Sequence, residues 1–357
     1  MDESSMMGDE RRGILVIRLD RLGDVVLSTP VLRVLRRARP ESRLAVMVRP
    51  PCRDVVEAHP DVDEVILYDK EGAHRSAAAT IAFARALRGR FDAALVLHPS
   101  NRSHWIPWLA GIPVRIGYDR KSGWLLTHRM PHRKQEGERH EAAYTLELVR
   151  PLGIEPPAVA EASVPVSPEA FRRVGAVLSE AGIGPEVRPL AVHPSASCVS
   201  KRWMPERFAA VADRLAGDLG ERIVLVGGKP DAVHAAATAS AMRAPAVNLA
   251  GRLTVAELIA LLSRCRLLLS NDSGPVHLAA AVGTPVVDIF GRNQRGLSPL
   301  RWGPLGDGHV ILHKEVGCVT CLAHNCDIEF KCLTELGVDE VYQACAAVLA
   351  RQTAAGS

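Results

Sequence analysis

The stretch that decides the fold runs from residue 266 to residue 290 and reads RLLLSNDSGPVHLAAAVGTPVVDIF. Its apolar run at 266–269 predicts a buried strand, and a polar turn with glycine and proline separates that strand from a helix predicted over 276–281. A second apolar, β-branched run at 286–290 predicts another strand. Strand, helix and strand in this order are typical of a parallel βαβ unit.

The same alternation extends along most of the chain. Further strands are predicted at 13–19, 43–48, 64–67, 91–97, 190–193 and 222–226, and helices at 30–39, 77–88, 168–181, 205–219, 231–243, 254–263 and 338–349. Five prolines between residues 151 and 168 interrupt the pattern and predict a linker. We therefore expect an α/β protein with two domains, at 1–165 and 166–335, followed by a helix and tail at 336–357.

The composition restricts the class of protein. The chain has 357 residues, of which 47% are hydrophobic and 24% charged, as in a folded protein large enough for two domains. The net charge of +4 is small and no nucleic-acid-binding module is recognised, so we expect no nucleic-acid partner. No signal peptide is recognised, and the apolar runs are too short to span a bilayer, which predicts a cytoplasmic protein.

The loop at 270–277 has the features of an anion-binding site. Asp272 or Ser273 can cap the following helix, Gly274 lets the backbone approach a ligand closely, and the amides of the first helical turn attract anions. His277 would face the same end of the helix and could donate a hydrogen bond to a phosphate. A well-capped helix with a buried histidine explains the pattern equally well.

Two other loops of the C-terminal half also follow predicted strands. The first carries Ser195 and Lys201, and a lysine there can neutralise the charge that develops on a leaving nucleotide diphosphate. Its alternative is a solvated loop. The second is a Gly-Gly-Lys-Pro-Asp turn that ends at Asp231. It is not a complete Walker loop, so it predicts either a wall against the sugar or nucleoside or a plain tight turn.

The loop at 18–25 follows the first predicted strand. Its Asp24 is a candidate general base, because a carboxylate positioned after a strand can take the proton of a hydroxyl group. A helix cap is the alternative role for Asp24, and Asp20 is the competing base. Arg18 and Arg21 lie close by in sequence and are candidate acceptor-binding residues, as contacts for phosphates or carboxylates.

The segment 102–140 carries eight Lys or Arg side chains against three acidic ones, with three tryptophans among them. Arg102 and Arg120 belong to this set. The pattern predicts a surface for an anionic acceptor or a phospholipid face. A solvated basic loop is the alternative.

Four cysteines lie within a short segment near the C-terminus, at Cys318, Cys321, Cys326 and Cys332. Four thiolates with this spacing can surround one tetrahedral zinc or iron ion, and disulfides are not expected in the cytoplasm. Such an ion would be structural, since the pattern leaves no open coordination position. Four free thiols are the alternative.

Taken together, the motifs resemble glycosyltransferase family 9, the ADP-heptose heptosyltransferases of lipopolysaccharide core synthesis and their relatives. The motifs that carry the resemblance are Leu22-Gly23-Asp24, His193-Pro194, Lys201-Arg202-Trp203 with Pro205, Gly227-Gly228, Asn248-Leu249-Ala250-Gly251, and Asn271 to Pro275 with His277. The resemblance implies a GT-B fold, in which the parallel sheets of two Rossmann-like domains face a central cleft. It also implies an inverting mechanism that needs no metal for the chemistry.

The resemblance assigns roles by position. Asp24 matches the catalytic base, and Lys201 matches the lysine on the donor phosphates. The donor loop is matched by Asp272, Ser273, Gly274 and His277, and more weakly the donor contacts by Ser195 and Asp231. After Phe290-Gly291 relatives often continue with proline and a Thr-Asp pair, whereas this chain has Arg292-Asn293-Gln294.

The resemblance also implies the reaction and its partners. We expect transfer of a heptose, or a related sugar, from an ADP-sugar to a hydroxyl of an anionic glycolipid bound to the N-terminal domain, with peripheral contact at the inner membrane. A second hypothesis is a transferase of the same fold with a protein or natural-product acceptor. A third is a sugar-nucleotide-binding protein without catalysis.

Overall fold

The computed structural model describes residues 13–318 and 320–355. They form two compact units. The N-terminal unit comprises residues 13–133 and Ala142–Ala160, and the C-terminal unit comprises Lys134–Glu141 and residues 161–355.

The N-terminal unit is built on a six-stranded sheet with the order β3-β2-β1-β4-β5-β6. Its strands are β1 (Gly13–Arg18), β2 (Arg43–Val48), β3 (Glu64–Leu67), β4 (Ala93–Val96), β5 (Val114–Tyr118) and β6 (His128–Met130), and each pairing is parallel. Every residue of β1 is buried, as expected for a parallel strand covered on both faces.

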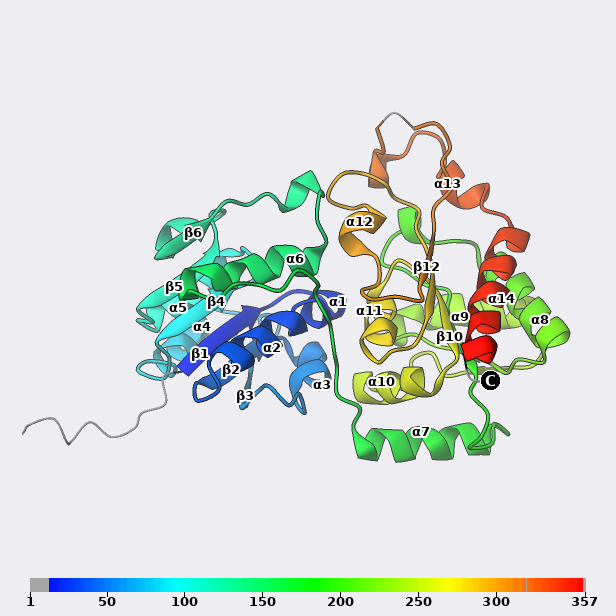
Figure 1. Ribbon diagram of the computed structural model, residues 1–357, viewed down its shortest axis with the longest axis horizontal. Coiled ribbons are helices and arrows are strands. Elements are labelled where there is room, and N and C mark those ends of the chain that lie inside the picture. The colour runs from blue at the N-terminus through cyan, green and yellow to red at the C-terminus, as the bar shows by residue number, and fades with distance from the viewer. Residues whose placement is uncertain (1–12, 319, 356–357) are drawn as a thin grey trace, which may run out of the picture. The chain divides into compact units, whose positions relative to one another are not determined.

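Short helices lie between or after these strands (Figure 1). They are α1 (Leu22–Val26), α2 (Thr29–Ala38), α3 (Arg53–Val56), α4 (Ala77–Arg85), α5 (Asn101–Leu109) and α6 (Glu141–Leu146). Serines cap two of them: Ser76 Oγ accepts from Ala79 N at 3.1 Å, and Ser100 Oγ accepts from Ser103 N at 3.1 Å. The cap of α5 matters for the site, because this helix starts at the end of β4.

The C-terminal unit repeats the same sheet with the order β12-β11-β10-β7-β8-β9. Its strands are β7 (Leu190–His193), β8 (Ile223–Leu225), β9 (Ala246–Asn248), β10 (Leu267–Asn271), β11 (Val286–Ile289) and β12 (Val310–Leu312), again paired in parallel. The helices are α7 (Pro168–Glu180), α8 (Pro205–Leu219), α9 (Ala232–Ala241), α10 (Val255–Arg264), α11 (Gly274–Ala281), α12 (Pro299–Trp302), α13 (Lys331–Thr334) and α14 (Val338–Ala355).

Both sheets reverse their strand order at one point. In the N-terminal unit the reversal lies between β1 and β4, and in the C-terminal unit it lies between β7 and β10. Open α/β sheets bind ligands outside the carboxyl ends of the strands at this switch point. A ligand site is therefore expected at the loops after these four strands. They include three of the four loops singled out from the sequence, and the fourth, which ends at Asp231, follows β8.

The expected α/β class is confirmed, with two six-stranded parallel sheets. The sequence patterns missed β5, β6, β9 and β12, three of which contain only three residues. All three lie at or beside a sheet edge and are incompletely buried, so they lack the continuous apolar run that identifies a central strand.

The C-terminal helix was expected as a separate tail, but α14 belongs to the C-terminal unit. It lies beside α8 (Figure 1), and its Val341, Cys345 and Val348 are buried in the same core as Trp203 and Phe208. The apolar positions of α14 thus complete the C-terminal core.

The predicted domain boundary assigned Lys134–Glu141 to the N-terminal domain, whereas the structure places this segment in the C-terminal unit. In the structure it packs on the C-terminal unit through a buried ion-pair triad. Glu141 Oε1 meets Lys134 Nζ at 2.6 Å, and Glu141 Oε2 meets Arg301 Nη2 at 2.7 Å. A Cβ at Gly137 would lie 2.3 Å from the Gly296 nitrogen, so the two backbones approach closely. Pairing between distant residues, which no local pattern reveals, fixes this boundary.

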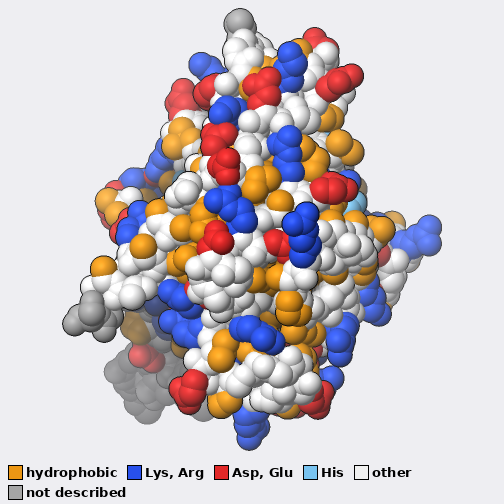
Figure 2. Space-filling model, turned by 90° about the vertical axis from the view of Figure 1, so that its right-hand side faces the viewer, with side chains coloured by type: hydrophobic (Ala, Val, Ile, Leu, Met, Phe, Trp, Pro, Cys, Tyr) orange, Lys and Arg blue, Asp and Glu red, His pale blue; other side chains and the backbone are white. Residues whose placement is uncertain are grey.

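Among the described residues, no helix combines the length and apolar character needed to cross a membrane. Figure 2 shows one face of the molecule, on which Lys and Arg side chains alternate with Asp and Glu. This face carries no continuous patch of a single charge.

Candidate active site

The two switch-point loops of the C-terminal unit are joined by a buried asparagine. Asn271, the last residue of β10, accepts a hydrogen bond from Trp203 N at 3.0 Å through Oδ1 and donates to Ser195 O at 3.3 Å through Nδ2. Its side chain is fully buried. Asn271 therefore holds the loop after β7 against the loop after β10 and brings Ser195, Lys201 and Asp272 into one neighbourhood.

Lys201 and Arg292 share one carboxylate oxygen. Asp272 Oδ2 lies 2.7 Å from Lys201 Nζ and 3.2 Å from Arg292 Nη2. All three side chains are largely buried. Behind them, burial, reinforced by the negative charge of Asp272, raises the pKa of Asp288 well above its usual range. Within these ion pairs, two cations contact a single carboxylate.

A second cluster surrounds His193 at the end of β7. Its Nδ1 lies 3.2 Å from Ser270 Oγ and 3.1 Å from Ser273 Oγ, and its Nε2 lies 3.5 Å from Asp231 Oδ2. Burial opposes ionisation of Asp231, but hydrogen bonds from His193, Ser195 and the Gly228 amide lower the pKa of Asp231 below its usual range. The structure thus brings the predicted donor residues Ser195, Asp231 and Ser273 together around one imidazole.

Gly274 begins α11 and His277 lies in its first turn. His277 is buried, with 5% of its surface exposed. The sequence left a choice between an anion site and a capped helix. In the structure Ser273 occupies the N-cap position but its side chain makes no capping bond, since its hydroxyl is directed to Ser270 and His193. Ser273 therefore does not cap α11 through its side chain, whereas the buried His277 agrees with the alternative. The first-turn amides are suited to an anion.

The switch point of the N-terminal unit has the opposite balance of charge. Arg18 is buried, and its guanidinium forms ion pairs with Asp20 Oδ1 and Asp24 Oδ1, both at 2.8 Å. Arg18 Nη1 also donates to Leu97 O at 3.2 Å. Asp24 Oδ2 accepts from Arg21 N at 3.3 Å, so the carboxylate also caps α1 as the alternative role proposed. Two carboxylates here face one arginine.

His98 joins this cluster from the loop after β4. Its Nδ1 lies 3.1 Å from Asp20 Oδ2, and 44% of its side chain is exposed. Asp20, the competing candidate for the base, is therefore shared between Arg18 and His98. Asp24 has no such histidine partner in the ion pairs of this cluster, and 14% of its side chain is exposed.

The four arginines predicted to bind the acceptor lie in different settings. Arg18 is buried between carboxylates, which favours a role in positioning Asp24. Arg102 donates to the carbonyls of Lys70, His74 and Arg75 and so supports a loop. Arg21 and Arg120 are exposed at the surface. Of the four, only these two present an exposed guanidinium to an acceptor.

The cysteine-rich segment folds next to the end of β11. Asn293 N donates to Cys321 Sγ at 3.4 Å, and Phe330 N donates to Cys326 Sγ at 3.3 Å. Burial, followed by the charges of neighbouring thiols, raises the pKa of Cys332 to about 11. Over the residues that the structure describes, no three His, Cys, Asp or Glu side chains are arranged as a preformed metal site.

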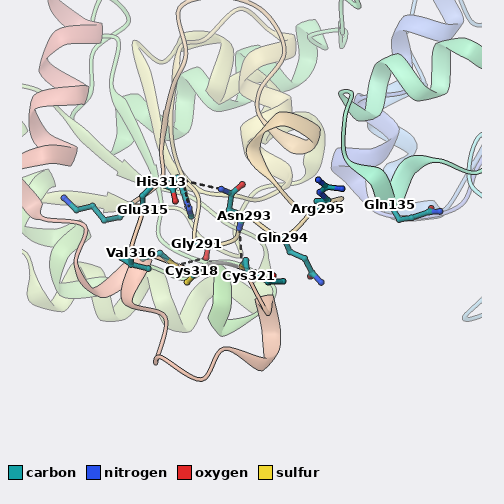
Figure 3. A pocket seen from close by; sticks show the side chains of 13 residues that line it. Gln135, Gly291, Asn293, Gln294, Arg295, His313, Glu315, Val316, Cys318 and Cys321 are labelled. Atoms are coloured by element: carbon teal, nitrogen blue, oxygen red, sulfur yellow. Dashed lines mark hydrogen bonds and ion pairs between the residues drawn. The ribbon is translucent and has the colours of Figure 1, made fainter.

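A cavity of about 620 Å³ opens between this segment, the loop after β11 and Gln135 (Figure 3). Cys318, Cys321 and Cys332 line it, with Asn293 and Arg295. None of the predicted donor-binding residues contributes to this lining. The candidate site is therefore identified by the contacts around Asp272 and His193 at the strand ends, and not by this cavity.

Sequence reasoning missed three residues of these networks as site residues: His98, His193 and Arg292. His193 ends a predicted strand and His98 directly follows one, and that position was the signal that could have identified them. Arg292 was noted only as a departure from the family pattern, because its partner Asp272 is twenty residues away.

Comparison with known proteins supports the motif resemblance. The sequence model of glycosyltransferase family 9 (heptosyltransferase) matches residues 80–331. The chain is 28% identical to lipopolysaccharide heptosyltransferase 3 of Escherichia coli over 288 residues, which cover 75% of this chain and 80% of that protein.

Solved structures match over nearly the whole chain. A family 9 glycosyl transferase from Veillonella parvula has a TM-score of 0.85 at 26% identity, with 97% of this chain and 99% of that chain covered. The ADP-heptose lipopolysaccharide heptosyltransferase II of E. coli has a TM-score of 0.79 at 23% identity, with 96% and 99% covered. These matches confirm the GT-B fold that the resemblance implied. Because the family model also spans well over half of the sequence, the chain belongs to glycosyltransferase family 9, the heptosyltransferase family.

Proposed function

We propose that this glycosyltransferase moves a heptose from ADP-heptose to a hydroxyl of an anionic glycolipid, with inversion at the anomeric carbon. One observation carries the proposal: the loops after β7, β8 and β10 bring Lys201, Asp231 and Ser273 together at the switch point of the C-terminal sheet. Relatives named as lipopolysaccharide heptosyltransferases support the choice of donor and acceptor.

The C-terminal unit would bind the donor. Lys201 and the amides at the start of α11 suit the two phosphates, because the cluster around Asp272 has an excess cation and a helix N-terminus attracts anions. His277 would donate to a phosphate oxygen. Ser195 and Asp231 would contact the nucleoside or sugar, where an ionised carboxylate can accept hydrogen bonds from hydroxyl groups.

Asp24 would act as the general base. The acceptor hydroxyl transfers its proton to the Asp24 carboxylate while the hydroxyl oxygen attacks the anomeric carbon and the bond to the nucleotide diphosphate breaks. Lys201 would then stabilise the negative charge left on the ADP oxygen. Arg18 would orient Asp24, since it holds one oxygen of the carboxylate and leaves further lone pairs on both oxygens. No metal ion takes part in these steps.

The acceptor and the membrane would meet the N-terminal unit. Trp105, Trp108 and Trp124 are exposed there, and Arg120 and Lys121 are exposed beside them in sequence. Tryptophan favours the membrane–water interface and basic side chains attract anionic headgroups. These residues support a peripheral contact with the cytoplasmic face of the membrane, at which an anionic glycolipid would be bound.

The cysteine-rich segment would hold a structural zinc or iron ion. Four thiols are a suitable donor set, and amide hydrogen bonds to Cys321 and Cys326 would stabilise them as thiolates. Because the described residues form no preformed site, binding would draw the segment together. Metal analysis of the purified protein tests this: about one ion per chain is expected, and its loss on mutation of Cys321 and Cys326 to serine identifies the ligands.

The test of the function is a screen of nucleotide sugars by thermal shift, followed by a transfer assay. A ligand that binds only the folded protein raises its melting temperature, so ADP-heptose should give a larger shift than UDP- or GDP-sugars. Transfer to a lipid acceptor but not to protein or small-molecule acceptors supports the proposal. Binding without transfer to any acceptor would instead support the non-catalytic hypothesis.

A further inference from the structure

Arg292 is the feature of the candidate site that the proposed function leaves without a role. It follows Gly291 at the end of β11, and 7% of its surface is exposed. Its Nε is buried and has no hydrogen-bond partner among the described atoms. A Cβ at Gly291 would lie 2.5 Å from Ser200 O and 2.8 Å from Leu333 Cγ, so the absence of a side chain there lets the strand end pack against the residue before Lys201.

The charges in this cluster do not balance. Lys201 and Arg292 both contact Asp272 Oδ2, and burial raises the pKa of the neighbouring Asp288, which disfavours its charged form. One carboxylate can neutralise only one of the two cations. A buried charge without a counter-ion is unfavourable, so the cluster is poised to accept an anion.

We propose that Arg292 remains paired with Asp272 when the donor binds, so that Lys201 can leave Asp272 and contact the diphosphate of the donor. This inference rests on the proposed function for the identity of the anion. If Lys201 were the only partner of Asp272, its move to a phosphate would leave a bare carboxylate beside a diphosphate. With Arg292 in place, Asp272 stays neutralised and Lys201 changes partner without that repulsion. Arg292 is thus a positioning residue.

The cysteine-rich segment also contacts Arg292, through His324. His324 Nε2 lies 3.5 Å from Arg292 Nη1, and His324 Nδ1 lies 3.2 Å from Ser200 Oγ. A guanidinium only donates, so Nε2 is the accepting nitrogen and Nδ1 carries the proton toward Ser200. His324 therefore links the segment to both Arg292 and the residue that precedes Lys201, and it restricts where the guanidinium can lie.

The binding of ADP and of adenosine, measured by calorimetry, tests the inference. Arg292→Met should weaken ADP binding by about tenfold or more, because Asp272 then retains Lys201. Adenosine has no phosphates, so its affinity should stay within about twofold of the wild-type value. Arg292→Lys keeps the charge and should recover most of the ADP affinity. The matched control is Arg172→Met on α7, an exposed arginine that should leave both affinities unchanged.

The decisive variant combines Arg292→Met with Asp272→Asn. Removal of the carboxylate removes the need for a counter-ion, so the double variant should bind ADP as well as Asp272→Asn alone. His324→Ala should weaken ADP binding by a few-fold, with Asn325→Ala as its control. The inference is overturned if the loss caused by Arg292→Met persists in the Asp272→Asn background, or if adenosine binding falls equally. Wild-type protein that binds no ADP would instead refute the proposed function, and this inference with it.

Discussion

The two switch points have the same topology and opposite charge. In the N-terminal unit, one arginine, Arg18, lies between Asp20 and Asp24. In the C-terminal unit, one carboxylate, Asp272, lies between Lys201 and Arg292. In the first set of ion pairs two carboxylates contact one cation, and in the second two cations contact one carboxylate. The fold supplies the position of each site, and the residues after the strands decide whether a proton acceptor or a phosphate site is formed.

The difference also explains why we place the general base in the N-terminal unit and the donor site in the C-terminal unit. A carboxylate that accepts a proton must remain ionised and reachable, and Asp24 is partly exposed beside a fixed arginine. A diphosphate needs cations that are held in place before it binds, which reduces the reorganisation needed in the reaction. Substitutions that exchange or remove these charges test the comparison.

The largest effect is expected for Asp24→Asn. The amide cannot take the acceptor proton, so kcat should fall by about a thousandfold, within the range typical of lost general-base catalysis. Steady-state transfer assays measure this value. Asp92→Asn, at an exposed position of the same unit, should keep wild-type turnover. Retained turnover in Asp24→Asn with the fold intact would move the base to another residue, of which Asp20 with His98 is the first candidate.

Lys201→Met should reduce kcat/KM by on the order of a hundredfold, because the charge on the leaving ADP loses its closest cation. The reduction should appear with ADP-heptose and in the affinity for free ADP. Arg172→Met again provides the control. If only the transfer rate changed while ADP affinity stayed the same, Lys201 would act on the chemical step alone and the donor-phosphate contact would be wrong.

A smaller effect is expected for Arg18→Lys. The ammonium keeps the charge but cannot contact Asp20 and Asp24 at once as the guanidinium does, so kcat should fall by roughly tenfold while the KM for the donor is unchanged. Kinetics with varied donor concentration separate the two constants. A rise in the KM for ADP-heptose would place Arg18 at the donor and contradict the comparison.

The last prediction concerns stability rather than chemistry. His104 on α5 is fully buried, and burial lowers the pKa of its imidazole to about 4 although Asp119 acts in the opposite direction. The unfolded chain binds a proton near pH 6.5 while the folded protein does not, so the unfolding free energy should fall by up to about 3 kcal/mol between pH 6.5 and pH 4. Denaturant unfolding of His104→Leu should show a weaker dependence over this interval.

The sequence predicted the site unevenly, for a physical reason. Strand ends and turns are local patterns, so the sequence alone points to Asp24, Lys201 and the Asp272 loop. Partners that lie far apart in sequence are not visible locally. Arg292 contacts Asp272 from the loop after the neighbouring strand, and His324 contacts Ser200, which is 124 residues away. Lys134–Glu141 joins the C-terminal unit through a buried ion-pair triad. The short edge strands were missed because they bury too few apolar side chains.

The central claim is that the ion pairs around Asp272 bind the donor and that the ion pairs around Arg18 hold the general base. Calorimetric titration of ADP into wild-type protein, Asp24→Asn and Lys201→Met tests this claim most directly. The account predicts that Asp24→Asn binds ADP like the wild type although it has lost turnover, and that Lys201→Met has lost most of its ADP affinity. Equal ADP affinity in wild type and Lys201→Met, or a weakened affinity in Asp24→Asn, would contradict it.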